Sequence, residues 1–395
     1  MRYPRFSVAK KHPGEEYFDE KNKDAIQLER RNLLSAGAAG IATLAALSYP
    51  TPGKSAVAIS AAAVKNIKDY GVVGDGTTDD TKAINDALRD ILRPVDDAIV
   101  FPAGTYKVSG TIEITGKIRT TIYGSGAIIR SDPGAGTIIK IKGGSEVTLH
   151  GFSLRSFGNN GGHGIEIIDS PYTRLREVFV VDVSKSCLYA ERSWWLSTIA
   201  CAFLKPGNGH AAAHQLGAMN NVVHLNTRFV GYTGKDGREC PGVIHNDGSS
   251  VNFIGCDFSV CEPAARIVAG TCINFHACYF EGNPRGIVWG HDVSGWPQSL
   301  TVDTCYFQFS PLIKDTIGIE IVRGGYVQIR NNQFVSAGSS VYSTVCIRNN
   351  DSNFIVHVTV DRNQATTNVS TFLQDLGTRT GNRVKAPVLE PFIPQ

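Results

Sequence analysis

The chain has 395 residues, of which 42% are hydrophobic and 19% charged, so it has enough apolar residues to build a core and wholesale disorder is excluded. The 41 glycines and only two methionines favour a turn-rich β architecture over a helical bundle. The net charge is +3 and no concentrated basic run stands out, which excludes nucleic acid as the expected partner.

The first 58 residues have the features of an export signal. A charged stretch is followed by Arg30-Arg31-Asn32-Leu33-Leu34, an apolar run Leu33–Ser48 and small residues at Ala56-Val57-Ala58. The paired arginines resemble a twin-arginine signal, although Glu29 and the long charged region depart from that pattern. We therefore predict a secreted or periplasmic protein with no membrane span after signal removal. The alternative is an Ala/Gly-rich helix that docks the domain to a partner such as a virion.

An eight-residue pattern recurs through the body of the chain. It reads VNFIGCDF (Val251–Phe258), INFHACYF (Ile273–Phe280), LTVDTCYF (Leu300–Phe307) and VQIRNNQF (Val327–Phe334), with weaker copies that end at Phe203 and Phe229. Short alternating runs at a common period of this size predict the coils of a parallel β-helix. Residues 59–365 would make about twelve coils, with a cap and first coils over 59–120, further coils over 121–365 and a tail over 366–395.

The repeat register predicts ladders of identical side chains inside the coils. Cys256, Cys278 and Cys305 form one such ladder, and the closing phenylalanines form another. The nine cysteines contain no CxxC pair, so we interpret them as buried reduced thiols rather than metal ligands. A Cys240–Cys261 disulfide stays open.

The most specific stretch is KDYGVVGDGTTDDTKAI (Lys68–Ile84), followed by AIVFPAGTYKVSGTIEI (Ala98–Ile114). Here a glycine turn leads to Asp79 or Asp80 as the N-cap of a helix predicted over Thr81–Leu92. These segments resemble the N-terminal start of the pectate-lyase-like superfamily, in the branch related to glycoside hydrolase family 28 and to phage tailspikes. The resemblance implies an all-β, single-domain, right-handed parallel β-helix with an N-terminal capping helix. It also implies an enzyme that acts on polysaccharide, and a homotrimer as one assembly to test.

The family 28 signature is only partly present. Gly162-His163-Gly164 matches its last element, but the only Asp-Asp pairs, Asp79-Asp80 and Asp96-Asp97, lie near the N-terminal cap. We therefore interpret His163 as a turn residue in a glycine-rich corner. A calcium-dependent lyase needs clustered aspartates, which are not evident, so we expect no cofactor and no metal.

The repeat register also predicts which polar side chains face outward together. One column contains His276, Asp303 and Arg330, and the next contains Asp257, Tyr279 and Tyr306, with Glu281 at the following bend. Glycoside hydrolysis requires two carboxylates, one as acid and one as nucleophile or base. Our leading hypothesis is a glycoside hydrolase with catalytic Glu281 and a partner at Asp257 or Asp303. The expected substrate-binding residues are His276, Tyr279, Tyr306, Arg285, Arg330 and His245.

Two rival functions remain open. A tyrosine or histidine base with an arginine suits a uronate lyase or epimerase, in which a base removes the proton next to a carboxyl group. The other rival is an adhesin or virion spike that binds glycan without cleaving it. The insertions 204–220 and 231–248 bring His210, His214 and His245 to one side and are further candidates for a binding site.

Overall fold

The computed structural model describes residues 64–90, 95–231, 240–290, 298–310, 313, 315–323, 325–336, 344–349, 356–366 and 369–375. All of them belong to one compact unit, Ala62–Gln395. The signal predicted over residues 1–58 lies outside the described residues. Among those that are described, no helix is long and apolar enough to cross a membrane.

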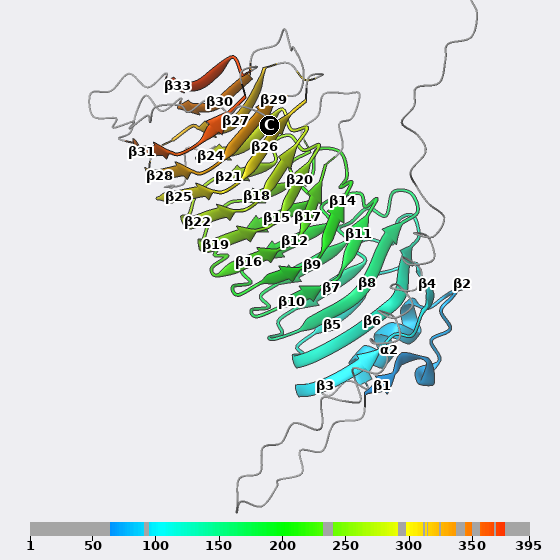
Figure 1. Ribbon diagram of the computed structural model, residues 1–395. Helices are drawn as coiled ribbons and strands as arrows, with labels where there is room; N and C mark the ends of the chain where they lie inside the picture. The colour runs from blue at the N-terminus through cyan, green and yellow to red at the C-terminus, as the bar shows by residue number, and fades with distance from the viewer. Residues whose placement is uncertain are drawn as a thin grey trace, which may run out of the picture. The chain divides into compact units, whose positions relative to one another are not determined.

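The N-terminal end of the unit is a small cap (Figure 1) that contains the 3-10 helix η1 (Ile67–Tyr70) and the helix α2 (Thr81–Asp90). Asp80 precedes α2, and its backbone C=O accepts the N–H of Ile84 at 2.9 Å. Its buried carboxylate instead accepts the N–H groups of Val73 and Gly74, at 2.7 and 2.9 Å. The side chain of Asp79 accepts from Thr81 N at 3.0 Å. The two aspartates thus hold the turn and the helix start, as the sequence predicted.

The rest of the unit is a stack of parallel strands in two sheets. Sheet B has eleven strands, one per coil: β5 Ile112–Thr115, β7 Ile139–Lys142, β9 Ile165–Ile168, β12 Leu188–Glu191, β15 Ala213–Leu216, β18 Val243–His245, β21 Ala265–Ile267, β24 Arg285–Trp289, β27 Thr316–Ile321, β30 Thr344–Asn349 and β33 Thr371–Asp375.

Sheet A has 22 strands and begins with β1 Lys65–Asn66, β2 Asp75–Asp79, β3 Val95–Val100, β4 Gly104–Val108, β6 Ile118–Ser131 and β8 Thr148–Ser156. It continues as two short strands per coil: β10 Arg174–Arg176, β11 Phe179–Val181, β13 Ser197–Ile199, β14 Ala202–Leu204, β16 Val222–Leu225, β17 Arg228–Val230, β19 Ser249–Ile254, β20 Asp257–Ser259, β22 Thr271–His276, β23 Tyr279–Glu281, β25 Ser299–Asp303, β26 Tyr306–Phe309, β28 Gly325–Arg330, β29 Gln333–Ser336, β31 Val356–Asp361 and β32 Gln364–Ala365.

The predicted right-handed parallel β-helix with a capping helix is confirmed, with fewer coils than expected. Sheet B has one described strand in each of eleven coils, against about twelve coils predicted from length. The difference arises because the chain before Ile112 forms the cap and strands of sheet A, and contributes no described strand to sheet B. At the other end, β33 pairs with β30 and carries sheet B past residue 365.

The core follows the predicted register. Phe258, Phe280, Phe307 and Phe334 pair in successive coils. Their rings stack at centroid distances of 4.9, 4.4 and 4.8 Å. Cys256, Cys278 and Cys305 are buried free thiols beside this ladder. Cys240 and Cys261 are free as well, so the disulfide left open by the sequence is not formed in this structure.

Candidate functional site

The predicted outward patch lies on sheet A, and the strand register brings its columns together. Asp257 pairs with Tyr279, which pairs with Tyr306, and the two tyrosine rings stack at 5.5 Å. In the neighbouring column His276 pairs with Asp303, which pairs with Arg330. These side chains face outward because strand residues alternate between the core and the surface.

The charged groups of this patch neutralise one another. Asp257 accepts from Arg228 Nε at 2.9 Å and from the Ser259 hydroxyl at 2.5 Å. Asp303 Oδ2 lies 3.6 Å from His276 Nδ1 and 3.5 Å from Arg330 Nε.

Burial of Asp303 opposes its ionisation, but hydrogen bonds from Asn331 and Thr304 and the charges of Arg330 and His276 outweigh it and lower its pKa. Asp303 is therefore held as an anion beside Arg330, which suits a surface ion-pair column.

The two proposed partners of Glu281, Asp257 and Asp303, lie at different Cα distances from it. Glu281 pairs with Ser259, two residues after Asp257, which puts the Glu281 and Asp257 Cα atoms roughly 8 Å apart. Asp303 pairs with His276, five residues before Glu281, so the corresponding separation is roughly 15 Å. Paired catalytic carboxylates lie about 5–10 Å apart. At the level of the Cα atoms, Glu281 is thus nearer to Asp257 than to Asp303.

Two predicted binding residues are engaged elsewhere. His245 is fully buried inside the coils, where its Nδ1 lies 3.0 Å from Gln215 Oε1. The prediction that it binds substrate is wrong for this structure because β18 turns His245 toward the core, in register with Gln215 and Ile267. Arg285 forms an ion pair with Glu262 at a bend. Residues 232–239 of the second insertion lie outside the described residues.

A second polar cluster lies on the outer face of sheet B, and we name His163, Tyr189, His210 and His214 the histidine cluster. Glu166, Tyr189 and His214 occupy one outward column, in β9, β12 and β15. The His163 ring lies 4.8 Å from that of Tyr189, and the His214 ring 5.7 Å from it on the other side. All four cluster side chains are half-buried.

The glycines around His163 are required by close packing of neighbouring coils. A Cβ atom at Gly162 would lie 2.2 Å from the backbone N of Thr137, and one at Gly164 would lie 2.6 Å from the carbonyl oxygen of Cys187. No larger residue fits at either position without movement of the backbone. The Gly-His-Gly segment is thus a tight corner, as predicted, and it presents the imidazole to Tyr189.

The histidines of this cluster are neutral near pH 7. Burial is the main cause that lowers the pKa of His163 to about 4, with the charges of Lys185 and His210 acting in the same direction against Glu166. Burial, and then Lys185, also lower the pKa of His210. Neither ring nitrogen of His210 has a hydrogen-bond partner within the described part of the chain. A neutral imidazole with an unoccupied nitrogen is able to accept a proton.

Charged groups flank the histidine cluster on both sides. Lys185 is exposed, and its ammonium makes no ion pair with the residues described. Lys140 pairs with Glu166 at 3.1 Å, and the Tyr189 hydroxyl donates to Glu191 at 3.1 Å. No group of three or more His, Cys, Asp or Glu side chains in the described ranges is placed to hold a metal ion.

The sequence does not predict that these residues meet. Its pattern places His163 in a turn, and His210 and His214 in an insertion. The phenylalanine repeat defines the register of sheet A only, and the short runs of sheet B have no comparable marker. The detectable signal is that an apolar alternating run begins shortly after each of Gly162-His163-Gly164 and His210, so both segments lead into sheet B strands.

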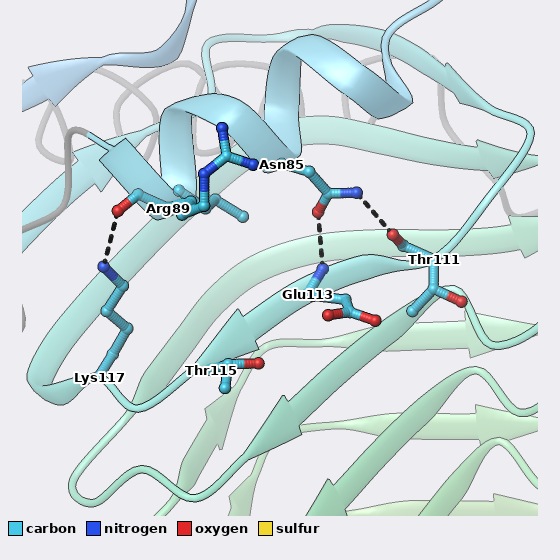
Figure 2. Close-up of a pocket in the computed structure, with 7 residues that line it drawn as sticks. Asn85, Arg89, Thr111, Glu113, Thr115 and Lys117 are labelled. Atoms are coloured by element: carbon cyan, nitrogen blue, oxygen red, sulfur yellow. Dashed lines mark hydrogen bonds between the residues drawn. The ribbon is translucent and has the colours of Figure 1, made fainter.

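A trough lies on the same face, next to α2 (Figure 2). It consists of two adjoining hollows of about 600 and 410 Å³ that share Glu113 and Thr115. The first is walled by Asn85, Leu88 and Arg89 of α2, and Thr111 and Lys117 complete its lining. The second is lined further by Gly116, Lys140, Lys142 and Gly143.

Comparison with known proteins identifies the class of fold and site. Residues 64–310 match the family described as rhamnogalacturonase A/epimerase, pectate lyase-like. The match spans more than half of the chain, which therefore belongs to this family. The resemblance inferred from the glycine turn and the repeat is thereby confirmed.

Individual relatives match over shorter stretches or at lower identity. Alginate lyase 7 of Azotobacter vinelandii is 35% identical over 108 residues, which is 26% of this chain and 12% of that protein. The chain thus spans only a small part of the first curated relatives it matches.

Solved structures show the same fold at low identity. The surface adhesin PfbA of Streptococcus pneumoniae has a TM-score of 0.52 at 15% identity, with 78% of this chain and 91% of that chain covered. The tailspike of E. coli bacteriophage HK620, solved in complex with a hexasaccharide, has a TM-score of 0.59 at 11% identity, with 82% and 66% covered.

Proposed function

We propose that the protein is an extracellular enzyme that acts on an acidic polysaccharide by removing the proton next to a sugar carboxylate, as a lyase or an epimerase. The observation that carries this proposal is the stacking of the corner segments that contain His163, Lys185 and His210: the Lys185 N–H donates to the Gly162 carbonyl at 3.0 Å, and the Lys185 carbonyl accepts the Gly207 N–H at 2.9 Å. Family membership and the local similarity to an alginate lyase support a carbohydrate substrate. The apparent export signal supports the location outside the cytoplasm.

The histidine cluster offers a division of roles. His210, whose ring nitrogens bond to no described residue, is the base that takes the proton from the carbon next to the carboxylate. His163 accepts the backbone N–H of Ser186 at Nδ1, 3.2 Å away, so its Nε2 carries a proton and donates to the substrate carboxylate. Lys185 supplies positive charge for the negative charge that accumulates on that carboxylate.

The electron pair left on the carbon then has two fates. In a lyase it forms a carbon–carbon double bond while the bond to the glycosidic oxygen breaks, and that oxygen takes a proton from solvent. In an epimerase the same carbon takes a proton on its opposite face, and no bond in the chain breaks. Both reactions begin with the same proton transfer, so one set of residues serves either.

The test is a polysaccharide panel that includes alginate and polygalacturonate. Unsaturated products are followed by ultraviolet absorbance, reducing ends are measured chemically, and proton exchange in D₂O is followed by NMR. For the wild-type protein we expect proton exchange, accompanied by ultraviolet absorbance if it is a lyase and not if it is an epimerase. For His210→Gln we expect a loss of at least about a hundredfold in kcat. The matched control is His150→Gln on sheet A, where the imidazole lies 3.6 Å from Glu177. Full activity of His210→Gln would overturn the assignment.

A second candidate function is glycoside hydrolysis on sheet A. It is favoured by the exposed Glu281 carboxylate, which has no hydrogen-bond partner among the described residues, and by its spacing from Asp257. The stacked Tyr279 and Tyr306 offer an aromatic surface for sugar rings. Release of reducing ends without ultraviolet absorbance or proton exchange would support glycoside hydrolysis. Binding of a polysaccharide with none of these three signals would support a glycan-binding adhesin.

A further inference from the structure

The trough beside α2 contains two charged groups that make no direct ion pair or hydrogen bond with described residues, although Asp169, which is paired with Arg192, also feels the charge of Lys142. The Lys142 ammonium forms no ion pair, and the Glu113 carboxylate accepts no hydrogen bond, from the residues that the structure describes. Both side chains are exposed and line the hollows. In register, Glu113 lies opposite Lys140, and Thr115 opposite Lys142. A lysine and a carboxylate thus point outward from adjacent strands.

The wall of the trough is held in place by Asn85. Its Nδ2 donates to the carbonyl of Thr111 and its Oδ1 accepts the N–H of Glu113, both at 2.8 Å (Figure 2). Asn85 therefore bonds to the outer edge of β5 as a neighbouring strand would. Asn85 covers only the first part of the β5 edge. Beyond Asn85 the hollow opens toward Thr115 and Lys117. The cavity is built by the docking of the helix on the strand.

We propose that this trough is a binding subsite for a carboxylate-bearing sugar residue of the polysaccharide, with Lys142 on the carboxylate and Glu113 on the sugar hydroxyls. The inference rests on the proposed function, because it assumes an acidic glycan at the histidine cluster. The carboxylate of Glu113 is suited to accept hydrogen bonds from hydroxyl groups. The negative charge of Glu113 also disfavours ligands of higher charge density, such as phosphates.

The position of the subsite predicts the path of the glycan. Lys142 lies in β7 and Tyr189 in β12, with β9 between them. Lys142 is in register with Ile168 and Glu191, so Tyr189 lies two coil steps along the stack and two residues back along the strand, at a Cα separation of roughly 12 Å. His163 and His210 precede their strands and lie further back still, so an oligosaccharide that joins the two places runs obliquely across sheet B. A glycan chain that binds at both the trough and the histidine cluster has its reacting sugar beside His163 and His210, while a second sugar carboxylate occupies the trough.

The experiment compares wild-type protein with Lys142→Ala, Lys142→Arg and the control Lys205→Ala, whose lysine is exposed at the end of β14. The probes are oligogalacturonates and oligomannuronates of two and eight residues. Binding is measured by calorimetry in the His210→Gln background, and kcat and KM are measured in the active protein. For Lys142→Ala we expect about tenfold weaker binding of an octamer and a raised KM with kcat unchanged. Lys142→Arg should restore most of the loss.

The length of the oligosaccharide distinguishes binding at a specific subsite from a general effect of the positive charge of Lys142. A dimer is too short to span both places, so its productive binding should be the same with and without Lys142. Equal octamer binding by wild type and Lys142→Ala overturns the subsite, whether or not the protein proves to be a lyase or epimerase. Octamer binding that depends on Lys142 in a protein without such activity supports the subsite and overturns the reaction. Failure of every acidic oligosaccharide to bind overturns both.

Discussion

The backbone N–H of Ser186 donates to Nδ1 of His163 across 3.2 Å, which leaves the proton of the neutral ring on Nε2. A ring in this state donates a hydrogen bond and does not act as a base. His163→Gln, which keeps a donor, should therefore retain more activity than His163→Leu, which has none. We expect the leucine variant to lose about 10²–10³-fold in kcat, as removal of one stabilising donor does. Steady-state kinetics check this, and equal losses in the two variants would contradict it.

The pH dependence of the reaction should follow His210. Because burial and Lys185 lower its pKa, the base stays neutral and competent below the ordinary histidine value. The acid limb of kcat/KM should thus lie below about pH 6.5. Lys185→Ala removes a charge that opposes protonation, so the limb should move to higher pH. A limb that stays in place in this variant would show that Lys185 does not act on the base.

Glu281→Gln distinguishes the two catalytic surfaces. If chemistry occurs at the histidine cluster, this substitution on an exposed position of sheet A should leave kcat within about twofold of the wild-type value. If hydrolysis at Glu281 and Asp257 is the reaction, the same variant should lose at least about a hundredfold. Both variants, His210→Gln and Glu281→Gln, are to be assayed on the same substrate, with circular dichroism to verify folding.

Phe280 should contribute strongly to stability. Its ring is nearly fully buried and stacks on Phe258 and Phe307, at 4.9 and 4.4 Å. Phe280→Ala should lower the free energy of unfolding by about 3–5 kcal/mol, measured by urea denaturation. Phe157→Ala is the matched control, because that residue is 54% exposed and the Arg130 guanidinium lies over its ring, 5.4 Å from the centroid. It should cost no more than about 1 kcal/mol.

Two histidines inside the coils should make the fold sensitive to acid. Burial lowers the pKa of His224 to about 3 and that of His245 to about 4. In the unfolded chain both return to about 6.5, so below that pH the unfolded state binds more protons. Stability should be fully present above about pH 6.5 and fall with decreasing pH toward the folded values, by up to about 1.4 kcal/mol per pH unit for each histidine.

The acid sensitivity is measured by urea denaturation between about pH 4.5 and 7. His245→Leu should be less stable at neutral pH, because Gln215 loses a hydrogen-bond partner. Its stability should nevertheless depend less steeply on pH than that of the wild type. An unchanged slope would mean that other groups are responsible for the acid sensitivity.

The sequence by itself determined the fold, the ladders and the N-terminal cap. The recurrence of Phe258, Phe280 and Phe307 at the end of an alternating run specifies parallel stacking, because identical side chains then pack on one another in every coil. The glycine turn with Asp79 and Asp80 is largely local, since Asp80 accepts from Val73 and Gly74 and Asp79 accepts from Thr81, although Asp79 also accepts from Ser109. These features depend on period and on near neighbours, which a sequence displays directly.

Only the tertiary structure decided which polar residues meet across the corners between the two sheets. The register of sheet A already predicted the neighbours of Tyr279, but the distance from Glu281 to Asp303 depends on which of the two short strands each residue occupies. The inward direction of His245 and the approach of His163 to Tyr189 depend on how the corners between sheets are closed. A corner of variable length shifts the next strand by any number of residues. Its effect on side-chain direction follows from packing between coils and not from the order of residues.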